Sequence, residues 1–236
     1  MAILARLLLT LAFLASMANA QTIPDLSATW ARKGCMPNSD VCPYVETDKP
    51  LTARAKAFRD MFDEIAAPKY DCVQATAPSL IIDPYNFKIE QESDRVILTY
   101  EKDDIVRTVW LEGHGHKKPS VYDFFTQGYS TGRYEGNQLV VETARFSFDP
   151  TGLDDMRNLP SSTQKRVVER YWREGNALKV DVITEDPIFL LEPIKFGFEW
   201  TRTDQPLLLP YDCDPELSKQ PLQFTPTKYP EPERKK

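Results

Sequence analysis

The stretch that decides the fold is Gly132-Arg-Tyr-Glu-Gly-Asn-Gln-Leu-Val-Val-Glu-Thr143. Its centre, Glu135-Gly136-Asn137, is a turn signal, because Gly and Asn tolerate positive φ. A similar phrase recurs as Arg170-Tyr-Trp-Arg-Glu-Gly-Asn-Ala-Leu-Lys-Val-Asp-Val182. Two copies are too few for a repeat protein. The pattern therefore predicts two similar hairpins in one sheet.

Further strands flank these hairpins. The segments 95–100 and 105–111 are rich in β-formers and are separated by the turn at Asp103-Asp104, and 195–200 alternates aromatic and polar residues. Six or more antiparallel strands joined by short turns must hide their edges. We expect a mainly β fold over 76–213, an antiparallel meander closed as a lipocalin-like barrel. A β-sandwich is the alternative.

The flanking segments lack this period. Residues 21–75 are expected to form an irregular lead-in and one N-terminal helix over 52–66, with Thr52 as N-cap. An apolar stripe is expected to pack on the core, and Pro68 to end the helix. The stripe consists of Phe58, Met61, Phe62 and Ile65. The tail, 214–236, is rich in proline and charge, which predicts a disordered or surface-laid segment.

The first 20 residues have the pattern of a secretory signal peptide. Arg6 precedes a short apolar run that ends in Ala18-Asn19-Ala20, which predicts cleavage before Gln21 and a periplasmic or secreted protein. The run is too short to favour a membrane span. Cleavage removes one base, so the net charge moves from −6 to −7 (28 bases against 35 acids). This acidic balance argues against nucleic acid as a partner.

Four cysteines, Cys35, Cys42, Cys72 and Cys213, predict two disulfides in an exported chain. Cys35 and Cys42 flank a loop of turn formers, so we expect them to pair, which leaves Cys72 to pair with Cys213. A four-thiolate metal site is the alternative, but the spacing does not fit a zinc ribbon. No Gly-rich phosphate loop is present, and we predict neither a metal nor another cofactor.

Arg107 is the most informative charged residue. Strict alternation places it on the same face as Ile105, Val109 and Leu111, and a charge on an apolar face needs a partner. The acids that could pair with it are Glu135, Glu142, Glu169 and Asp181. Arg107 is therefore either half of an internal ion pair or an anchor for an anionic or carbonyl ligand.

Other side chains complete the candidate site. The expected ligand-binding residues are Arg107, Trp110, Arg133 and Tyr171, and the expected acid–base residues are His116, Tyr134 and Glu135.

Two apparent motifs carry less weight. His114 and His116 could share a face and bind a metal, but the lysines beside them oppose a cation, which favours a solvated loop. Ser130 lies in a G-x-S-x-G phrase, yet a strand follows it and both histidines precede it, unlike a nucleophile elbow.

Several segments resemble a widespread family of secreted bacterial proteins without an assigned activity. They are 83–89, 107–113, 128–143, 167–171, 185–187 and 211–213. The family's usual phrase has Trp at the place of Tyr134 and Asp at that of Asn137. Its Asp-Gly-Arg-x-His-Pro run is matched here only by Gly113 and His116, and the His and acid of its Pro-His-Ser-Glu run are replaced at 160–163. The resemblance implies export and a β-rich fold, and it transfers no catalytic residue.

Three functions follow as hypotheses. The first is an exported β-barrel that binds a small, largely apolar or amphipathic ligand in its interior. The second is a metal-free acid–base enzyme, a lyase, isomerase or hydrolase, acting on such a ligand; this rests on fold-level analogy. The third is an envelope interaction module that uses the proline-rich ends.

Overall fold

The computed structural model describes residues 23–32, 50–83 and 85–225. The expected signal peptide, 1–20, and the expected Cys35–Cys42 disulfide lie outside these residues. Among the described residues, no helix combines the length and the apolar character needed to cross a membrane.

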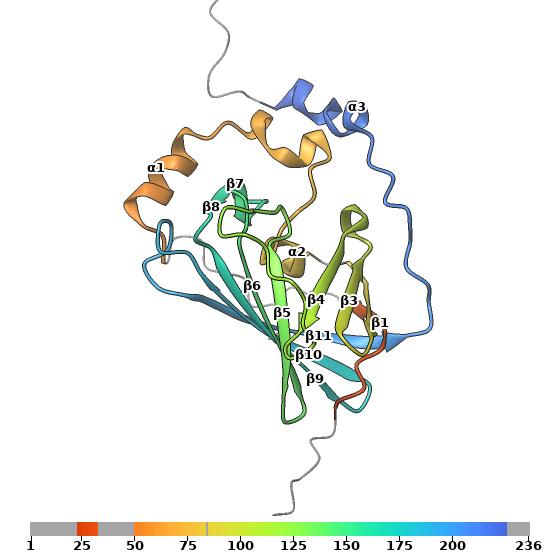
Figure 1. Ribbon diagram of the computed structural model, residues 1–236. Helices are drawn as coiled ribbons and strands as arrows, with labels where there is room; N and C mark the ends of the chain where they lie inside the picture. Colours follow the sequence, from red (N-terminus) through yellow and green to blue (C-terminus); the bar gives the residue numbers. More distant parts are fainter. Residues whose placement is uncertain (1–22, 33–49, 84, 226–236) are drawn as a thin grey trace, which may run out of the picture.

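The chain forms a closed barrel in the order β1-β11-β10-β9-β6-β5-β4-β3-β2 (Figure 1). The strands are β1 (Ala28–Arg32), β2 (Phe87–Gln91), β3 (Arg95–Tyr100), β4 (Val106–Leu111), β5 (Tyr129–Glu135), β6 (Gln138–Ala144), β9 (Arg166–Glu174), β10 (Ala177–Glu185) and β11 (Ile194–Thr203). The predicted mainly β barrel is confirmed. One feature departs from a pure meander: β4 and β5 are parallel, joined by the crossover 112–128, whereas the other neighbouring pairs are antiparallel.

Alternation builds the barrel core. In β10, Leu178, Val180 and Val182 are buried, and their neighbours Lys179 and Asp181 face outward. The two sequence-related hairpins, β5–β6 and β9–β10, lie side by side because β6 pairs with β9. Each turns through a glycine with positive φ, +59° at Gly136 and +60° at Gly175. The predicted pair of hairpins in one sheet is therefore present.

The expected irregular lead-in differs from the structure at β1. Ala28–Arg32 pairs with both β2 and β11 and so closes the barrel. The fully buried Trp30 is its anchor, and the Trp30 indole donates to the Leu26 carbonyl oxygen at 3.0 Å. A five-residue strand with one fully buried side chain shows no clear period of two, which is why its sequence reads as irregular.

Helical segments lie near one end of the barrel, close to the hairpin of β7 (Asp149–Asp154) and β8 (Leu159–Ser161) (Figure 1). They are α1 (Ala53–Met61), η1 (Glu64–Ala66), η2 (Pro68–Asp71), α2 (Ser79–Ile82), α3 (Pro215–Ser218) and η4 (Gln220–Phe224), and η3 (Lys102–Asp104) connects β3 to β4. The proline-rich tail, as far as Thr225, thus forms short helical turns with mostly exposed residues.

The predicted helix is shorter than expected. Thr52 is its N-cap, since its hydroxyl accepts from the Ala55 N–H at 3.1 Å, but α1 ends at Met61. Phe58 packs against Phe62 and Phe189, whereas Met61 is 62 % exposed. The expected apolar stripe was therefore wrong at its C-terminal end, because the chain leaves the helix before the stripe is complete.

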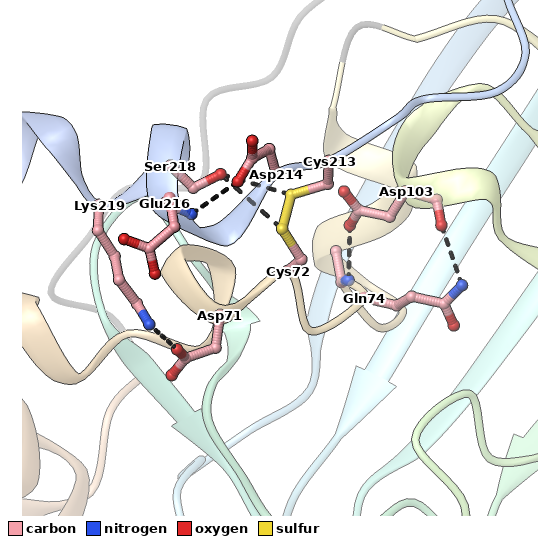
Figure 2. The surroundings of a disulfide bond; sticks show 10 residues. Asp71, Cys72, Gln74, Asp103, Cys213, Asp214, Glu216, Ser218 and Lys219 are labelled. Atoms are coloured by element: carbon pink, nitrogen blue, oxygen red, sulfur yellow. Dashed lines mark hydrogen bonds and ion pairs between the residues drawn. A yellow bond between two sulfur atoms is a disulfide. The ribbon is translucent and has the colours of Figure 1, made fainter.

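The predicted Cys72–Cys213 disulfide is present (Figure 2). It joins the residue after η2 to the segment before α3, across 141 positions of sequence. Beside it, Lys219 Nζ lies 2.6 Å from Asp71 Oδ1, and Gln74 Nε2 donates to the Asp103 carbonyl oxygen at 2.9 Å. The bridge thus holds the C-terminal segment against the loops at one end of the barrel.

Candidate ligand-binding site

A pocket opens where the parallel strands part. The β4–β5 register covers three pairs, Val109–Leu111 with Ser130–Gly132, so the earlier part of β4 has no β5 partner. A pocket of about 260 Å³ occupies this place. It is lined by Val106, Arg107, Thr108, Trp110, Phe125, Gln127, Gly128, Tyr129 and Ser130. We call it the β4–β5 pocket.

Arg107 is the buried charge of this pocket, 2 % exposed. Its guanidinium donates to both carboxylate oxygens of Glu169, at 2.6 Å and 3.2 Å. Further hydrogen bonds run from Arg107 to Thr143 Oγ1 at 3.1 Å and to the Tyr100 hydroxyl at 3.3 Å, and Tyr171 donates to Glu169. Of the four acids that the sequence offered, the structure pairs Arg107 with Glu169.

Electrostatics favour the charged form of Arg107 and the neutral forms of Tyr100 and Tyr171. Burial disfavours the Arg107 cation, but attraction to Glu169, Tyr100 and Tyr171 and the hydrogen bond to Glu169 together outweigh burial and raise the Arg107 pKa. Burial, reinforced by the Glu169 charge, raises the pKa of Tyr171, and burial raises that of Tyr100. The cluster therefore joins the Arg107–Glu169 ion pair to two neutral phenols.

Two buried polar atoms, in residues that line the pocket, have no hydrogen-bond partner among the described residues. One is Arg107 Nε, a buried donor, and the other is Gln127 Oε1, a buried acceptor. The Gln127 amide is oriented by Nε2, which donates to the Ala75 carbonyl oxygen at 2.7 Å. Because a carbonyl can only accept, this contact fixes Oε1 as the free atom. Buried polar groups are normally satisfied, so these two atoms are exceptions among the residues that line the pocket.

Aromatic rings surround the opening. The Trp110 and His116 rings stack with centroids 3.6 Å apart and planes 4° apart, and His116 also stacks at 5.9 Å with Tyr129. Phe125 forms a bridge with Phe146, in the segment that follows β6, and is 41 % exposed. Trp110, Phe125 and Tyr129 therefore give the pocket an aromatic part of its lining.

Comparison with known proteins identifies no relative from which the role of a residue in this chain could be inferred. No family model, curated protein or solved structure matches this chain. The assignment of the site therefore depends on the geometry of the described residues.

The structure brings only part of the predicted site together. Arg107 and Trp110 line the β4–β5 pocket, His116 lies against its rim, and Tyr171 lies behind Arg107 through Glu169. Arg133 is instead on the outer face of β5, where it forms ion pairs with Glu135 and Glu142.

The expected acid–base group of His116, Tyr134 and Glu135 is divided by the barrel wall. Tyr134 packs against the core and accepts from Gln91 Nε2 at 2.8 Å. Glu135 is exposed and lies 2.8 Å from Arg170 Nη1 on the outside. Adjacent residues of one strand point to opposite faces, which separates them. Ser130 also differs from a nucleophile: it is a buried strand residue whose Oγ lies 2.8 Å from Thr143 Oγ1.

Sequence reasoning missed Gln127 and Phe125. Both lie in the crossover 112–128, which has no strand or helix period. The only available signal was the cluster of aromatic residues Tyr122, Phe124 and Phe125 before Gly128. A larger hollow of about 570 Å³ lies over β1, β2 and β11, but none of its lining residues has a buried polar atom without a partner. The β4–β5 pocket is therefore the better candidate.

Proposed function

We propose that this protein is an exported β-barrel that binds a small, largely apolar ligand in the β4–β5 pocket. The observation that carries the proposal is the lining of the pocket, which combines the aromatic side chains Trp110, Phe125 and Tyr129 with a few polar side chains. Apolar walls with a few directed polar groups are typical of small-molecule sites. Export is supported by the pattern of residues 1–20 and by the Cys72–Cys213 disulfide, a bond typical of oxidising compartments.

The ligand position differs from the interior site expected from the sequence. Large side chains occupy the barrel interior, including Trp30, Phe87 and Tyr171. The β4–β5 pocket instead lies in the barrel wall, where the exposed Val106 and the buried Arg107 and Ser130 are all part of its lining. The resemblance to secreted bacterial proteins remains a prediction and adds no residue to this site.

A pocket-filling substitution tests the proposal. The neutral dye Nile red should gain fluorescence with the mature protein, and Val106→Trp should reduce this binding at least tenfold, because Val106 lines the pocket. The matched control is Val73→Trp, at a valine that is 46 % exposed and outside the pocket lining. Equal dye binding by both variants, with unchanged melting temperatures, would contradict the proposed site.

The natural ligand can be sought with the same pair of variants. Mature protein incubated with a cell lipid extract and repurified should retain a small molecule detectable by mass spectrometry. Val106→Trp should lose that molecule, and Val73→Trp should keep it. Retention by all three proteins would place the ligand elsewhere.

A further inference from the structure

We propose that residues 117–125, which we call the aromatic loop, dock this protein on the surface of an anionic lipid bilayer. The loop belongs to the crossover 112–128 between β4 and β5, and its exposed side chains are mostly aromatic, aliphatic or basic. Docking on a bilayer goes beyond the proposed ligand-binding function, and either property can be absent without the other.

The aromatic loop exposes several large apolar side chains in one place. Tyr122 is 86 % exposed and Val121 is 65 % exposed, and the values for Phe124 and Phe125 are 46 % and 41 %. Val106 of β4, which is also exposed, lies beside the loop because it lines the β4–β5 pocket together with Phe125. Single exposed apolar side chains are ordinary, whereas a group of them marks a surface that contacts an apolar partner.

Backbone and side-chain hydrogen bonds hold the loop in this exposed arrangement. The Ser120 N–H donates to Asp123 Oδ2 at 2.7 Å, and the Asp123 N–H donates to the Ser120 carbonyl oxygen at 3.1 Å, so residues 120–123 form a turn. Arg145 Nη1 donates to the same Ser120 carbonyl oxygen at 2.8 Å, and the Phe125 N–H donates to the Arg145 carbonyl oxygen at 2.9 Å. The turn is therefore fixed against the segment that follows β6.

Basic side chains lie next to the apolar ones. Lys117 and Lys118 are exposed and come shortly before the turn in the chain, and the Arg145 guanidinium contacts the turn itself. Asp123 is the only acid in residues 117–125, whereas the whole chain has a net charge of −6. Charges further away than the Debye length, about 8 Å at physiological ionic strength, are largely screened. The aromatic loop therefore presents a basic and apolar surface on an acidic protein.

The composition and the size of this surface favour a bilayer over a protein partner. Lysines are attracted to anionic head groups, and aromatic side chains are favoured at the boundary between head groups and acyl chains. A specific protein interface uses about 20–30 residues on each side. A bilayer requires no complementary shape, so a small number of side chains on one exposed turn is sufficient.

Co-sedimentation with vesicles tests the proposal on the mature protein. Vesicles of equal parts phosphatidylglycerol and phosphatidylcholine should bind the protein at least tenfold more strongly than vesicles of phosphatidylcholine alone, and added salt should weaken this binding. Equal binding to the two kinds of vesicle, or no binding to either, would overturn the proposal. The Nile red result, and with it the proposed function, would remain intact in both cases.

A double variant isolates the apolar contribution. Tyr122→Ser/Phe124→Ser should reduce binding to the anionic vesicles at least tenfold. The matched control is Leu217→Ser/Phe224→Ser, at exposed apolar residues in the C-terminal helical turns, and it should bind like the wild type. If no vesicle binds and the wild type captures a protein that Tyr122→Ser/Phe124→Ser does not, the loop is a protein interface and the proposal is wrong.

A second double variant isolates the basic contribution. Lys117→Gln/Lys118→Gln should reduce binding at least tenfold, because each lysine near an anionic surface strengthens binding about fivefold. Lys56→Gln/Lys195→Gln makes the same change in net charge at exposed lysines elsewhere and should keep wild-type binding. Undiminished binding by either loop variant, at an unchanged melting temperature, would overturn the proposal. If a loop variant does not fold, the comparison of the two kinds of vesicle with the wild-type protein still decides.

Discussion

Lys165 is a lysine enclosed by the protein, 1 % exposed. Its ammonium donates to Thr76 Oγ1 at 2.8 Å and to the Gly152 carbonyl oxygen at 3.1 Å, and it lies 4.2 Å from the centre of the Phe146 ring. Burial lowers its pKa to about 7, even though Asp149 and Asp186 favour the charged form. The folded protein therefore releases this proton near neutral pH.

The pH dependence of stability should report this residue. Between about pH 7 and the ordinary lysine value near 10.5, the unfolded chain binds the proton and the folded chain does not. The free energy of unfolding should therefore rise with pH in this window, with a contribution of about 1 kcal/mol per pH unit. Urea unfolding at pH 7.5, 8.5 and 9.5 measures this rise in the free energy of unfolding.

Lys165→Met should flatten this rise, and Lys195→Met, at an exposed lysine, should keep the wild-type slope. The assignment fails if all three proteins show the same slope.

The Arg107–Glu169 pair gives a second test at this scale. Glu169→Leu leaves a buried guanidinium without its counterion and should lower the free energy of unfolding by about 3–5 kcal/mol. Adding Arg107→Met removes that stranded charge, so the double variant should be more stable than Glu169→Leu alone. Chemical denaturation of the wild type, both single variants and the double variant forms the cycle; strictly additive losses would show that the pair is not coupled.

Among the strands, the close approach of β4 and β5 sets the shape of the pocket. A Cβ placed on Gly132 would lie 2.7 Å from Val109 Cγ1, across the parallel pair. Glycine is needed here for space between strands. The three residue pairs between β4 and β5 close the barrel wall, and the two strands separate directly beside these pairs.

Gly132→Ala should cost about 1–3 kcal/mol of stability, because the added methyl group forces β4 and β5 apart. Val109→Ala removes the group that would collide, so the double variant Gly132→Ala/Val109→Ala should lose less than the sum of the two single changes. Thermal and urea unfolding measure the coupling. A double variant that loses the full sum or more would show that the contact does not limit the approach of the strands.

In the whole molecule, hydrogen bonds and a disulfide attach the C-terminal segment to the barrel. After β11 the chain runs back along the barrel (Figure 1), where the Leu208 N–H donates to Glu101 and the Tyr211 N–H to Asp104. Cys213 then joins Cys72. The cross-link closes a long loop in the unfolded chain and so limits its conformational freedom.

Cys72→Ser/Cys213→Ser should lower the free energy of unfolding by up to about 5 kcal/mol, the chain-entropy value for so long a loop. Hydrogen exchange should accelerate at the Leu208 and Tyr211 amides while the barrel strands stay protected. Lys219→Met is the control: it breaks the neighbouring surface ion pair with Asp71 and should cost less than about 1 kcal/mol. Equal losses of unfolding free energy in the cysteine double variant and in Lys219→Met would show that the disulfide does not hold the C-terminal segment.

Local signals in the sequence were sufficient for several features. The alternation of Leu178, Val180 and Val182 and the buried position of Arg107 follow from the two-residue period of a strand, and the Gly-Asn turns follow from the tolerance of these residues for positive φ. The pairing of Cys72 with Cys213 followed once Cys35 and Cys42 were taken as neighbours. These inferences succeeded because each depends on residues close together in the chain or on a small number of alternatives.

Only the tertiary structure decided the closure and the site. The pairing of β1 with β11, the parallel β4–β5 contact and the choice of Glu169 for Arg107 join positions far apart in sequence. Strand partners and register depend on the packing of the whole barrel, which no local period encodes. The sequence by itself therefore determined the strands and the buried charge, and the packing of the barrel determined that this charge pairs with Glu169 beside the β4–β5 pocket.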